Sequence, residues 1–449
     1  MEEETIVALS SGSLPAGIAV VRISGPKAGL VLAALAGKLP EPRRASLRRI
    51  RNIAGATIDH GLVLFFPGPG SVTGEDLAEI HLHGGRAVVD ACVMAATTLP
   101  DVRLAEAGEF TRRAFENGRL DLTEAEGLAD LLSAQTEAQR AAAVAQSDGV
   151  LRDLYEGWMR RLTHARAMLE ASFDFADEGD VGEGVAASVH GETQSLAEEM
   201  RRHLAGAQRG EIVRSGFRVA IAGRPNVGKS SLLNALALRD VAIVSDVPGT
   251  TRDVLEVMLD LGGLPVRIFD TAGLRETGDR IEALGMDRAR QAIDQAHLVL
   301  LLDDGLGADP QDIGLTHVKH GERQTSDPTS IRIRSKSDLA AESAPGRFFD
   351  MAISTKTGEG LQPLVDRIAA LAAEAVGDAG DLIPLRLRHR DIVADALHQL
   401  DTVLSEPEQP EEIAAETLRR VSDRLGALTG RVGVEDVLDV IFGEFCIGK

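Results

Sequence analysis

The stretch Gly223-Arg-Pro-Asn-Val-Gly-Lys-Ser230 decides the fold class of this chain of 449 residues. It fits the pattern G-x-x-x-x-G-K-[ST], whose glycines let backbone N–H groups surround phosphate oxygens. The apolar run Phe217–Ala222 before it predicts a strand, and a helical pattern starts at Ser231. Because a helix N-terminus favours anions, the stretch predicts a nucleotide-phosphate site. We expect Lys229 to neutralise the phosphates and Ser230 to hold Mg²⁺.

Further apolar runs at Val266–Asp270 and Leu298–Asp303 predict strands, with helical patterns between them. Alternating strands and helices imply a parallel sheet with right-handed crossovers. Asp270-Thr-Ala-Gly273 ends one of these strands, where a Mg²⁺-holding Asp is expected. Gly249-Thr-Thr-Arg-Asp253 supplies a Thr that would join the Mg²⁺ shell while the γ-phosphate is present. Together these motifs resemble the translation-factor-related GTPases.

Ser335-Lys-Ser-Asp338 stands where that class usually has Asn-Lys-x-Asp. The Asp338 carboxylate can accept two hydrogen bonds from guanine, and adenine has no such donor pair. Ser335 lacks the amide that usually contacts the base and ties the loops together, so we expect weaker affinity with specificity retained. Ser354-Thr-Lys356 resembles the last guanine loop.

The residue that orients the attacking water is less clear from the motifs. Leu274 occupies the position where many GTPases have Gln, and it cannot orient water. Glu276 and Glu282 are the nearby candidates, and spacing alone does not choose between them. The sequence also names no arginine finger, so we expect a cation near the phosphates to replace it.

The charge balance limits how nucleic acid could be bound. The chain carries 48 Lys+Arg against 69 Asp+Glu, a net charge of −21, which excludes a uniformly basic nucleic-acid binder. Aromatic residues make up only 3%, which argues against a stacking platform for single strands. Two clusters could meet phosphates or could simply be solvated; they are Arg43, Arg44, Arg48, Arg49 and Arg51, and Arg386, Arg388 and Arg390.

The order of predicted strands and helices along the chain suggests an α/β domain inserted into a helical one. Residues 1–118 mix strands (Ile18–Ile23, Gly61–Phe66) with a helix (Ala87–Leu99). A helical pattern runs to Gly149 from a capping box with Thr123 at the N-cap and Glu126. We expect linkers near 210–216 and 376–384. The chain has two Cys, too few for a disulfide framework or a multi-Cys zinc site. Its N-terminus is acidic where a signal peptide would be basic, and the sequence has no run of 18 apolar residues, so we expect a cytoplasmic protein with no membrane span.

The whole chain resembles the MnmE (TrmE) family of tRNA uridine-modification GTPases. Two features carry most of this resemblance: a phosphate loop inserted between helical stretches, and Phe445-Cys-Ile-Gly-Lys449 at the end. The N-terminal motifs agree with it; they are Thr5-Ile-Val-Ala8, Val21-Arg-Ile-Ser-Gly25, Thr73-Gly-Glu-Asp76, His83-Gly-Gly85, Gly108-Glu-Phe-Thr111 and Arg113-Ala-Phe-Glu-Asn-Gly-Arg-Leu-Asp-Leu122.

The resemblance implies a multidomain α+β and α/β architecture. Residues 1–118 would be an α+β folate-binding and dimerisation domain, and residues 216–378 an inserted Ras-like P-loop GTPase domain. Residues 119–215 and 379–449 would form a discontinuous all-α domain. The resemblance implies a K⁺-stimulated GTPase activity. It also implies that the protein is a homodimer. It would form a heterotetramer with the flavoprotein MnmG, which carries FAD. The pair would modify C5 of the wobble uridine of certain tRNAs to aminomethyl or carboxymethylaminomethyl forms. The carbon would come from 5-formyl- or methylene-tetrahydrofolate.

The resemblance also implies site residues. It favours Glu282 over Glu276 for orienting water, so that the catalytic set becomes Glu282, Lys229 and Asn226. It implies K⁺ at Asn226, Ser245, Val247 and Thr250, Mg²⁺ at Ser230 and Thr251, and folate at Arg22, Glu79, Arg119 and Lys449. The motifs and the resemblance together predict GTP contacts from Asn226, Val227, Gly228, Lys229, Ser230, Ser231, Ser245, Asp246, Val247, Pro248, Gly249, Thr250, Thr251, Asp270, Thr271, Ala272, Gly273, Ser335, Lys336, Ser337, Asp338, Ser354, Thr355 and Lys356.

Some assignments rest on chemistry alone. By charge, Arg22 and Lys449 would meet the carboxylates of a folate, and Glu79 would accept from pterin N–H groups. Arg119 stands where the family commonly has Lys. Cys446 could be a nucleophile toward uracil C5, or a small buried residue in a tight terminal segment.

Two other functions fit the GTPase motifs. A regulatory GTPase of ribosome assembly would lack the terminal Cys-Ile-Gly-Lys, and the sequence has no recognisable KH module. A generic P-loop ATPase is disfavoured by Asp338. The acidic chain predicts weak tRNA binding without a partner protein.

Overall fold

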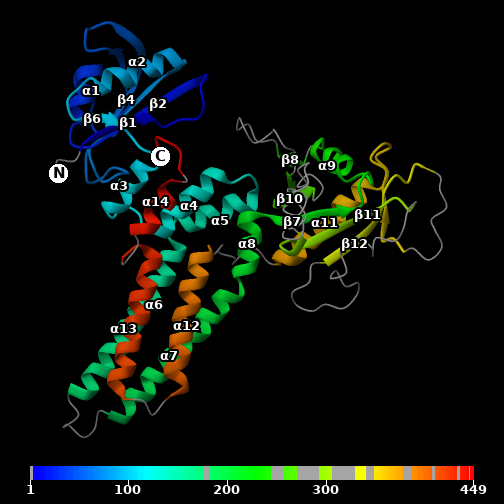
Figure 1. The fold of residues 1–449 in the computed structure, drawn as a ribbon. Helices are drawn as coiled ribbons and strands as arrows, with labels where there is room; N and C mark the ends of the chain where they lie inside the picture. Colours follow the sequence, from blue (N-terminus) through cyan, green and yellow to red (C-terminus); the bar gives the residue numbers. More distant parts are fainter. Residues whose placement is uncertain are drawn as a thin grey trace, which may run out of the picture. The chain divides into compact units, whose positions relative to one another are not determined.

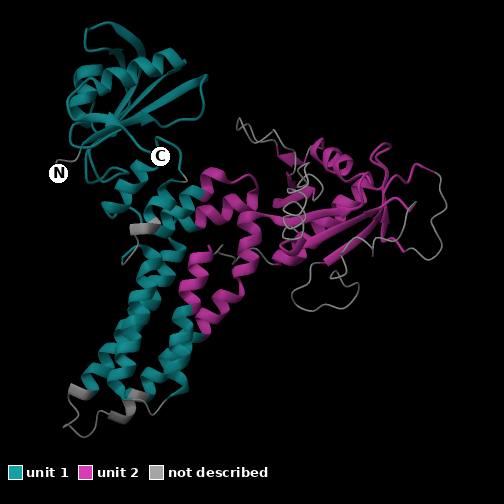
Figure 2. Ribbon diagram, viewed as in Figure 1, with its two compact units in different colours: residues 1–129, 146–197, 395–449 teal, residues 130–145, 198–394 magenta. Residues whose placement is uncertain are grey.

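The computed structural model describes residues 4–174, 182–239, 241–243, 256–270, 293–305, 329–339, 348–377, 386–406, 410–431, 435–443 and 445–449. The chain divides into two compact units (Figure 2). Unit 1 contains Met1–Ala129, Gln146–Ala197 and Asp395–Lys449, and unit 2 contains Asp130–Ala145 and Glu198–Ala394. The mixture of two sheets and a helical region agrees with the predicted fold class.

The N-terminal part of unit 1 is a six-stranded sheet in the order β3-β4-β5-β2-β1-β6. Its strands pair antiparallel, except that β1 pairs with β6 in parallel. The strands expected at 18–23 and 61–66 are confirmed, since they lie within β2 and β4. The bounds are β1 (Thr5–Leu9), β2 (Ala16–Ser24), β3 (Ser46–Arg51), β4 (Thr57–Phe66), β5 (Leu77–Gly84) and β6 (Val102–Leu104).

Alternation along the strands gives this sheet two different faces. Val21 and Ile80 belong to the core of one face, which α1 (Ala28–Ala36) and α2 (Arg86–Thr97) cover (Figure 1). The helix expected at 87–99 is α2. On the opposite face, Ile6, Ala8 and Ala105 pack with Phe110 of α3 (Glu109–Glu116). Arg22 and Glu79 alternate with the core residues of β2 and β5, so they lie on this second face.

Long helices form the rest of unit 1 and continue into unit 2, because the boundary passes within α4, α5, α7 and α12. In unit 1, α6 and α13 lie side by side and bury Tyr155 and Trp158, whose ring centroids are 5.6 Å apart (Figure 1). The bounds are α4 (Leu122–Ser133), α5 (Glu137–Ser147), α6 (Val150–Asp174), α7 (Gly182–Ala205), α12 (Leu387–Ser405), α13 (Glu411–Thr429) and α14 (Glu435–Gly443).

The capping box predicted at Thr123 and Glu126 is wrong, because both residues are buried inside α4. Asp121 caps this helix instead. Its Oδ1 accepts from the Glu124 N–H and the Thr123 hydroxyl, both at 2.8 Å, and Glu124 Oε2 accepts from the Asp121 N–H at 2.7 Å. The same reciprocal pattern therefore occurs two residues earlier. The helical pattern to Gly149 is also two helices, since α4 ends at Ser133 and α5 begins at Glu137.

Unit 2 is built on a seven-stranded sheet in the order β13-β12-β11-β7-β10-β9-β8. The strands from β13 to β10 are parallel, as predicted, and β9 and β8 add an antiparallel edge that the sequence did not indicate. The strands are β7 (Phe217–Gly223), β8 (Ala242–Ile243), β9 (Glu256–Leu261), β10 (Leu264–Asp270), β11 (Leu298–Asp303), β12 (Thr329–Arg334) and β13 (Met351–Ala352).

Among the helices with described bounds, α8 (Ala207–Ser215), α9 (Lys229–Ala237) and α11 (Leu361–Val376) pack on this sheet. The linker predicted near 210–216 is wrong, because α8 continues to Ser215 and places Ile212 and Val213 in the core of unit 2. At the second predicted linker α11 ends at Val376, and residues 378–385 lie outside the described residues. Among the helices that the structure describes, none combines the length and apolar composition that crossing a membrane requires.

Candidate functional site

The phosphate loop connects β7 to α9 at the carboxyl edge of the parallel strands. Its backbone is specialised: Gly223 has a φ of +149° and Gly228 a φ of +107°. A Cβ on Gly223 would lie 2.4 Å from the carbonyl oxygen of Leu302, so only glycine fits there. Asn226 adopts a φ of +62° although it is not glycine. The loop therefore holds the curled backbone that a phosphate cradle needs.

The predicted phosphate and Mg²⁺ residues lie at the start of α9. Lys229 is buried, and its Nζ donates to the carbonyl oxygens of Gly223 at 2.9 Å and Arg224 at 2.8 Å. Ser230 Oγ donates to Asp270 Oδ2 at 2.6 Å. A hydroxyl and a carboxylate side by side are hard oxygen ligands, and they fit Mg²⁺.

The guanine-loop residues lie at the same edge of the sheet, after β12 and β13. The exposed Asp338 carboxylate accepts a hydrogen bond from Ser354 Oγ at 2.8 Å, and Ser354 accepts from the Thr357 N–H at 3.2 Å. Thr355 and Lys356 continue the loop after Ser354. This contact leaves the second oxygen of Asp338 as a further acceptor, and it holds the carboxylate in one orientation.

Ser335 connects the predicted guanine loop to the phosphate loop. Its hydroxyl donates to the carbonyl oxygen of Val227 at 2.7 Å, and the residue is buried. Lys336 Nζ donates to the carbonyl oxygen of Asn226 at 2.9 Å. The tie between the two loops that Asn usually provides is made here by the serine hydroxyl and the neighbouring lysine.

Several predicted residues lie outside the described residues. They are Ser245, Asp246, Val247, Pro248, Gly249, Thr250, Thr251, Thr271, Ala272, Gly273, Leu274, Glu276 and Glu282. Conversely, sequence reasoning missed Arg224, whose Nη2 donates to Asp303 Oδ1 at 3.0 Å beside the phosphate loop. Nothing in the local sequence pattern relates two residues so far apart in the chain.

A second group of predicted residues lies on the N-terminal sheet of unit 1. Arg22 and Glu79 face each other across β2 and β5, and Arg22 Nη2 lies 3.0 Å from Glu79 Oε1. His81 Nε2 lies 3.3 Å from the other oxygen of Glu79, and the Arg22 guanidinium lies over the ring of Phe110. The two side chains form an ion pair, and the folate roles expected for Arg22 and Glu79 stay predictions.

The other two predicted folate residues approach the same sheet from later in the chain. Exposed Arg119 lies beside Gly74, where an added Cβ would be 3.3 Å from Arg119 Cγ. Lys449 follows Gly448, whose carbonyl oxygen accepts from Ser10 Oγ at 2.6 Å. Arg119 therefore lies beside the loop that precedes β5, and the terminal segment lies beside the end of β1.

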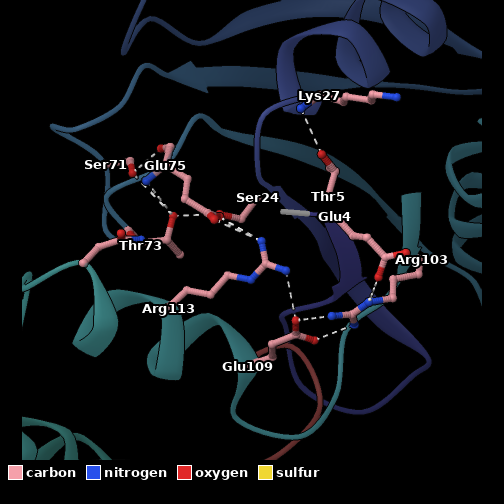
Figure 3. Close-up of polar contacts among 11 residues, drawn as sticks. Glu4, Thr5, Ser24, Lys27, Ser71, Thr73, Glu75, Arg103, Glu109 and Arg113 are labelled. Atoms are coloured by element: carbon pink, nitrogen blue, oxygen red, sulfur yellow. Dashed lines mark hydrogen bonds and ion pairs between the residues drawn. The ribbon is translucent and has the colours of Figure 1, made fainter. Parts of the chain in front are cut away.

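A network of ion pairs supports the loop beside Arg119, and sequence reasoning missed it (Figure 3). Arg113 Nη1 donates to both oxygens of Glu75, at 3.0 and 3.1 Å, and its Nη2 donates to Glu109 Oε1 at 3.0 Å. Ser24 Oγ donates to Glu75 Oε2 at 2.7 Å, and Arg103 donates to both oxygens of Glu109 at 2.6 and 2.8 Å. Burial alone would raise the pKa of Glu109, but these hydrogen bonds hold it below its ordinary value.

This network fixes the position of the loop 71–76. Glu75 belongs to the loop, and Asn117, at the end of α3, donates from Nδ2 to the carbonyl oxygen of Thr73 at 2.8 Å. Gly74 has a φ of +81°, and a Cβ there would lie 2.7 Å from the Cβ of Asn117. The loop and the end of α3 are thus in close contact, and this contact fixes the position of the backbone just before Arg119.

Cys446 is exposed, so the alternative of a buried structural cysteine is wrong. Its backbone carbonyl accepts from the N–H groups of Lys449 at 3.2 Å and Gly108 at 3.5 Å. These contacts hold the terminal segment against unit 1 while the thiol faces solvent.

Comparisons with known proteins cover almost the whole chain. Residues 5–119 match the family model described as GTP-binding protein TrmE N-terminus, and residues 122–446 match the MnmE helical domain model. The tRNA modification GTPase MnmE of Mesorhizobium japonicum is 51% identical, with 99% of each chain covered. That of Brucella anthropi is 49% identical, covering 100% of this chain and 98% of the relative. A solved G domain of the FeoB iron transporter from T. maritima is 26% identical, with a TM-score of 0.25, and covers 34% of this chain and 98% of that one.

Proposed function

The chain belongs to the MnmE (TrmE) family of tRNA modification GTPases, and from that premise we propose that its GTP hydrolysis supports modification of the wobble uridine at C5. The observation that carries the GTPase part is the convergence of Lys229, Ser230, Asp270 and Asp338 at one edge of the parallel sheet. Ligands bind at this edge in open α/β sheets.

In this proposal each described residue has a distinct task. Lys229 exchanges its two backbone carbonyl partners for the β- and γ-phosphate oxygens. Ser230 and Thr251 would bind Mg²⁺ and Asp270 would hold it through a water molecule, and the ion would neutralise developing phosphate charge. Asp338 accepts from guanine while Ser354 keeps it oriented. Glu282 orients the attacking water, and Asn226 shares in binding the K⁺ that replaces an arginine finger.

The N-terminal sheet would hold a tetrahydrofolate derivative at Arg22, Glu79, Arg119 and Lys449. Only part of the Arg22 guanidinium faces Glu79, because the contacts come from Nε and Nη2. The remaining donors stay available for a ligand carboxylate. The folate would supply the one-carbon unit, and Cys446 is the candidate nucleophile toward uracil.

The proposal includes the partners that the family implies. The chain would act as a homodimer in the cytoplasm, with the FAD-carrying flavoprotein MnmG completing a heterotetramer. We also propose the division 1–118, 119–215, 216–378 and 379–449 as the functional domains. Because most of the negative charge lies outside residues 1–118, the isolated chain would bind tRNA weakly.

Nucleoside analysis of tRNA from cells that lack this protein tests the proposal. We expect loss of the C5 modification at wobble uridines. Unchanged wobble uridines with altered ribosome profiles would instead favour a role in ribosome assembly. The GTPase rate in K⁺ and in Na⁺ tests the Asn226 assignment, and equal rates would contradict it. Full modification in a Cys446→Ser strain would exclude the thiol as nucleophile.

A further inference from the structure

Five of the nine residues from Arg43 to Arg51 are arginines, and none of the nine is acidic. We propose that this stretch, the β3 edge, binds the sugar-phosphate backbone of RNA. The proposal rests on the tRNA substrate of the proposed function, and adds where the RNA is held. The chain has a net charge of −21, so such a surface must be local.

The structure separates the two arginine clusters that the sequence left equivalent. In the second cluster, Arg386 Nη2 lies 2.9 Å from Asp130 Oδ1, and Arg390 Nη1 lies 3.6 Å from Glu211 Oε2. These two arginines are neutralised within unit 2. The second cluster is therefore no longer a candidate for phosphate binding.

The β3 edge is different, because its charges stay uncompensated. Arg44 pairs with Glu41, but no carboxylate in the described part of the chain pairs with Arg43, Arg48, Arg49 or Arg51. Arg48 contacts a backbone carbonyl at 3.2 Å, and Arg49 Nε lies 3.2 Å from His60 Nε2. Arg43 also uses a backbone carbonyl, that of Gly70. Four positive charges thus lie close together without a local counter-charge.

The position of these residues makes them accessible to a long polyanion. Among the described strands, β3 is the last of the sheet and pairs with β4 alone, so no described strand covers its other edge. Neighbouring residues alternate between the two faces, so Arg48 and Arg49 present donors on both sides of that edge. Guanidinium groups match phosphate with two parallel hydrogen bonds, and such contacts need no particular base sequence.

Charged residues on an edge strand can also serve only to prevent pairing with another sheet. That role requires charge but no bound partner. Phosphate binding makes a further demand, because each neutralised phosphate releases counterions and makes affinity fall with salt. The salt dependence of RNA binding therefore separates the two explanations.

The test measures binding of unmodified tRNA transcript to the full-length chain over a range of KCl concentrations. The variant is Arg48→Gln/Arg49→Gln/Arg51→Gln. A matched control, Arg419→Gln/Arg420→Gln/Arg424→Gln, removes the same charge from α13, where each arginine already faces a carboxylate. Removing three phosphate contacts should flatten the slope of log K against log salt by about 2 to 3.

We expect that change in the β3 variant only, with basal GTP hydrolysis unaltered. An Arg48→Lys/Arg49→Lys/Arg51→Lys variant should keep the slope, because lysine keeps the charge. Equal slopes in the wild type and the β3 glutamine variant would overturn the proposal. So would loss of flavoprotein binding without any change in tRNA binding, which would make the edge a protein-binding surface. If even the wild-type chain with its flavoprotein bound no tRNA, the proposed function itself would fail.

Discussion

Replacing Ser335 by alanine should weaken nucleotide binding without changing the base preference. The Ser335 hydroxyl joins the guanine loop to the carbonyl of Val227 in the phosphate loop. These loops bind opposite ends of one nucleotide, so holding them together lowers the ordering cost of binding. A buried neutral hydrogen bond contributes about 0.5–1.5 kcal/mol, and its loss should raise the Kd for GDP and for GTP about 2- to 12-fold.

The same loop supplies a matched control. Among the described residues, Ser337 has a buried hydroxyl oxygen without a hydrogen-bond partner. Ser337→Ala removes the same atom two positions away, and we expect nucleotide affinity close to wild type. Ser335→Asn restores the residue usual in this motif, and should bind at least as tightly as the wild type.

Titration of fluorescent GDP and GTP into the full-length variants measures these constants directly. The ratio of GTP to XTP affinity should stay constant in Ser335→Ala, since Asp338 is untouched. If Ser335→Ala and Ser337→Ala gave the same Kd, the hydroxyl would not organise the site and the reasoning would be refuted.

Three further changes test other parts of the molecule. Arg113→Met should destabilise unit 1 by about 3–5 kcal/mol, because it leaves the largely buried Glu75 carboxylate without a cation, while Glu109 keeps Arg103. In thermal unfolding the exposed-pair control Arg44→Ala should cost less than about 1 kcal/mol. Burial raises the pKa of Asp121 from 3.8 to about 6, so its charge costs stability above pH 6 and nothing below pH 3.8. Asp121→Asn should therefore stabilise the protein at pH 8 by at most about 3 kcal/mol and give no gain at pH 3.5, and an equal gain at both pH values would contradict the assignment. Asp338→Asn should move preference toward xanthosine nucleotides, and an unchanged ratio of GTP to XTP binding would mean that this loop does not read the base.

Local patterns in the sequence predicted the elements that carry the nucleotide site. The strand β7, the glycine-rich turn and the start of α9 follow from one continuous stretch, because each is determined by neighbouring residues. The segment 210–216, expected to be a linker, is helical as far as Ser215. Tertiary packing of Ile212 and Val213 keeps that segment helical.

Contacts between distant residues were not predictable in the same way. Arg113 and Glu75 both lie within motifs quoted from the sequence, but nothing in those motifs indicates that they pair. The two arginine clusters looked alike because their counter-charges come from other segments. Asp130 neutralises Arg386 although the two residues lie far apart in the sequence, and no spacing rule identifies this pair. Topology therefore decides which charges remain available, while composition gives only their sum.

The nucleotide site also joins two strained residues. Asn226 has a φ of +62° and Lys336 a φ of +54°, a conformation that costs about 1–3 kcal/mol for a residue other than glycine. The bond from Lys336 Nζ to the Asn226 carbonyl connects them, and Ser335 holds the next peptide. The guanine loop thus keeps the phosphate loop in a conformation that it would not adopt alone. In the proposed site, affinity would then depend on the ties between the loops, whereas base choice would depend on the Asp338 carboxylate. This separation explains how the chain can replace the usual Asn by Ser335 and still keep the carboxylate that selects guanine.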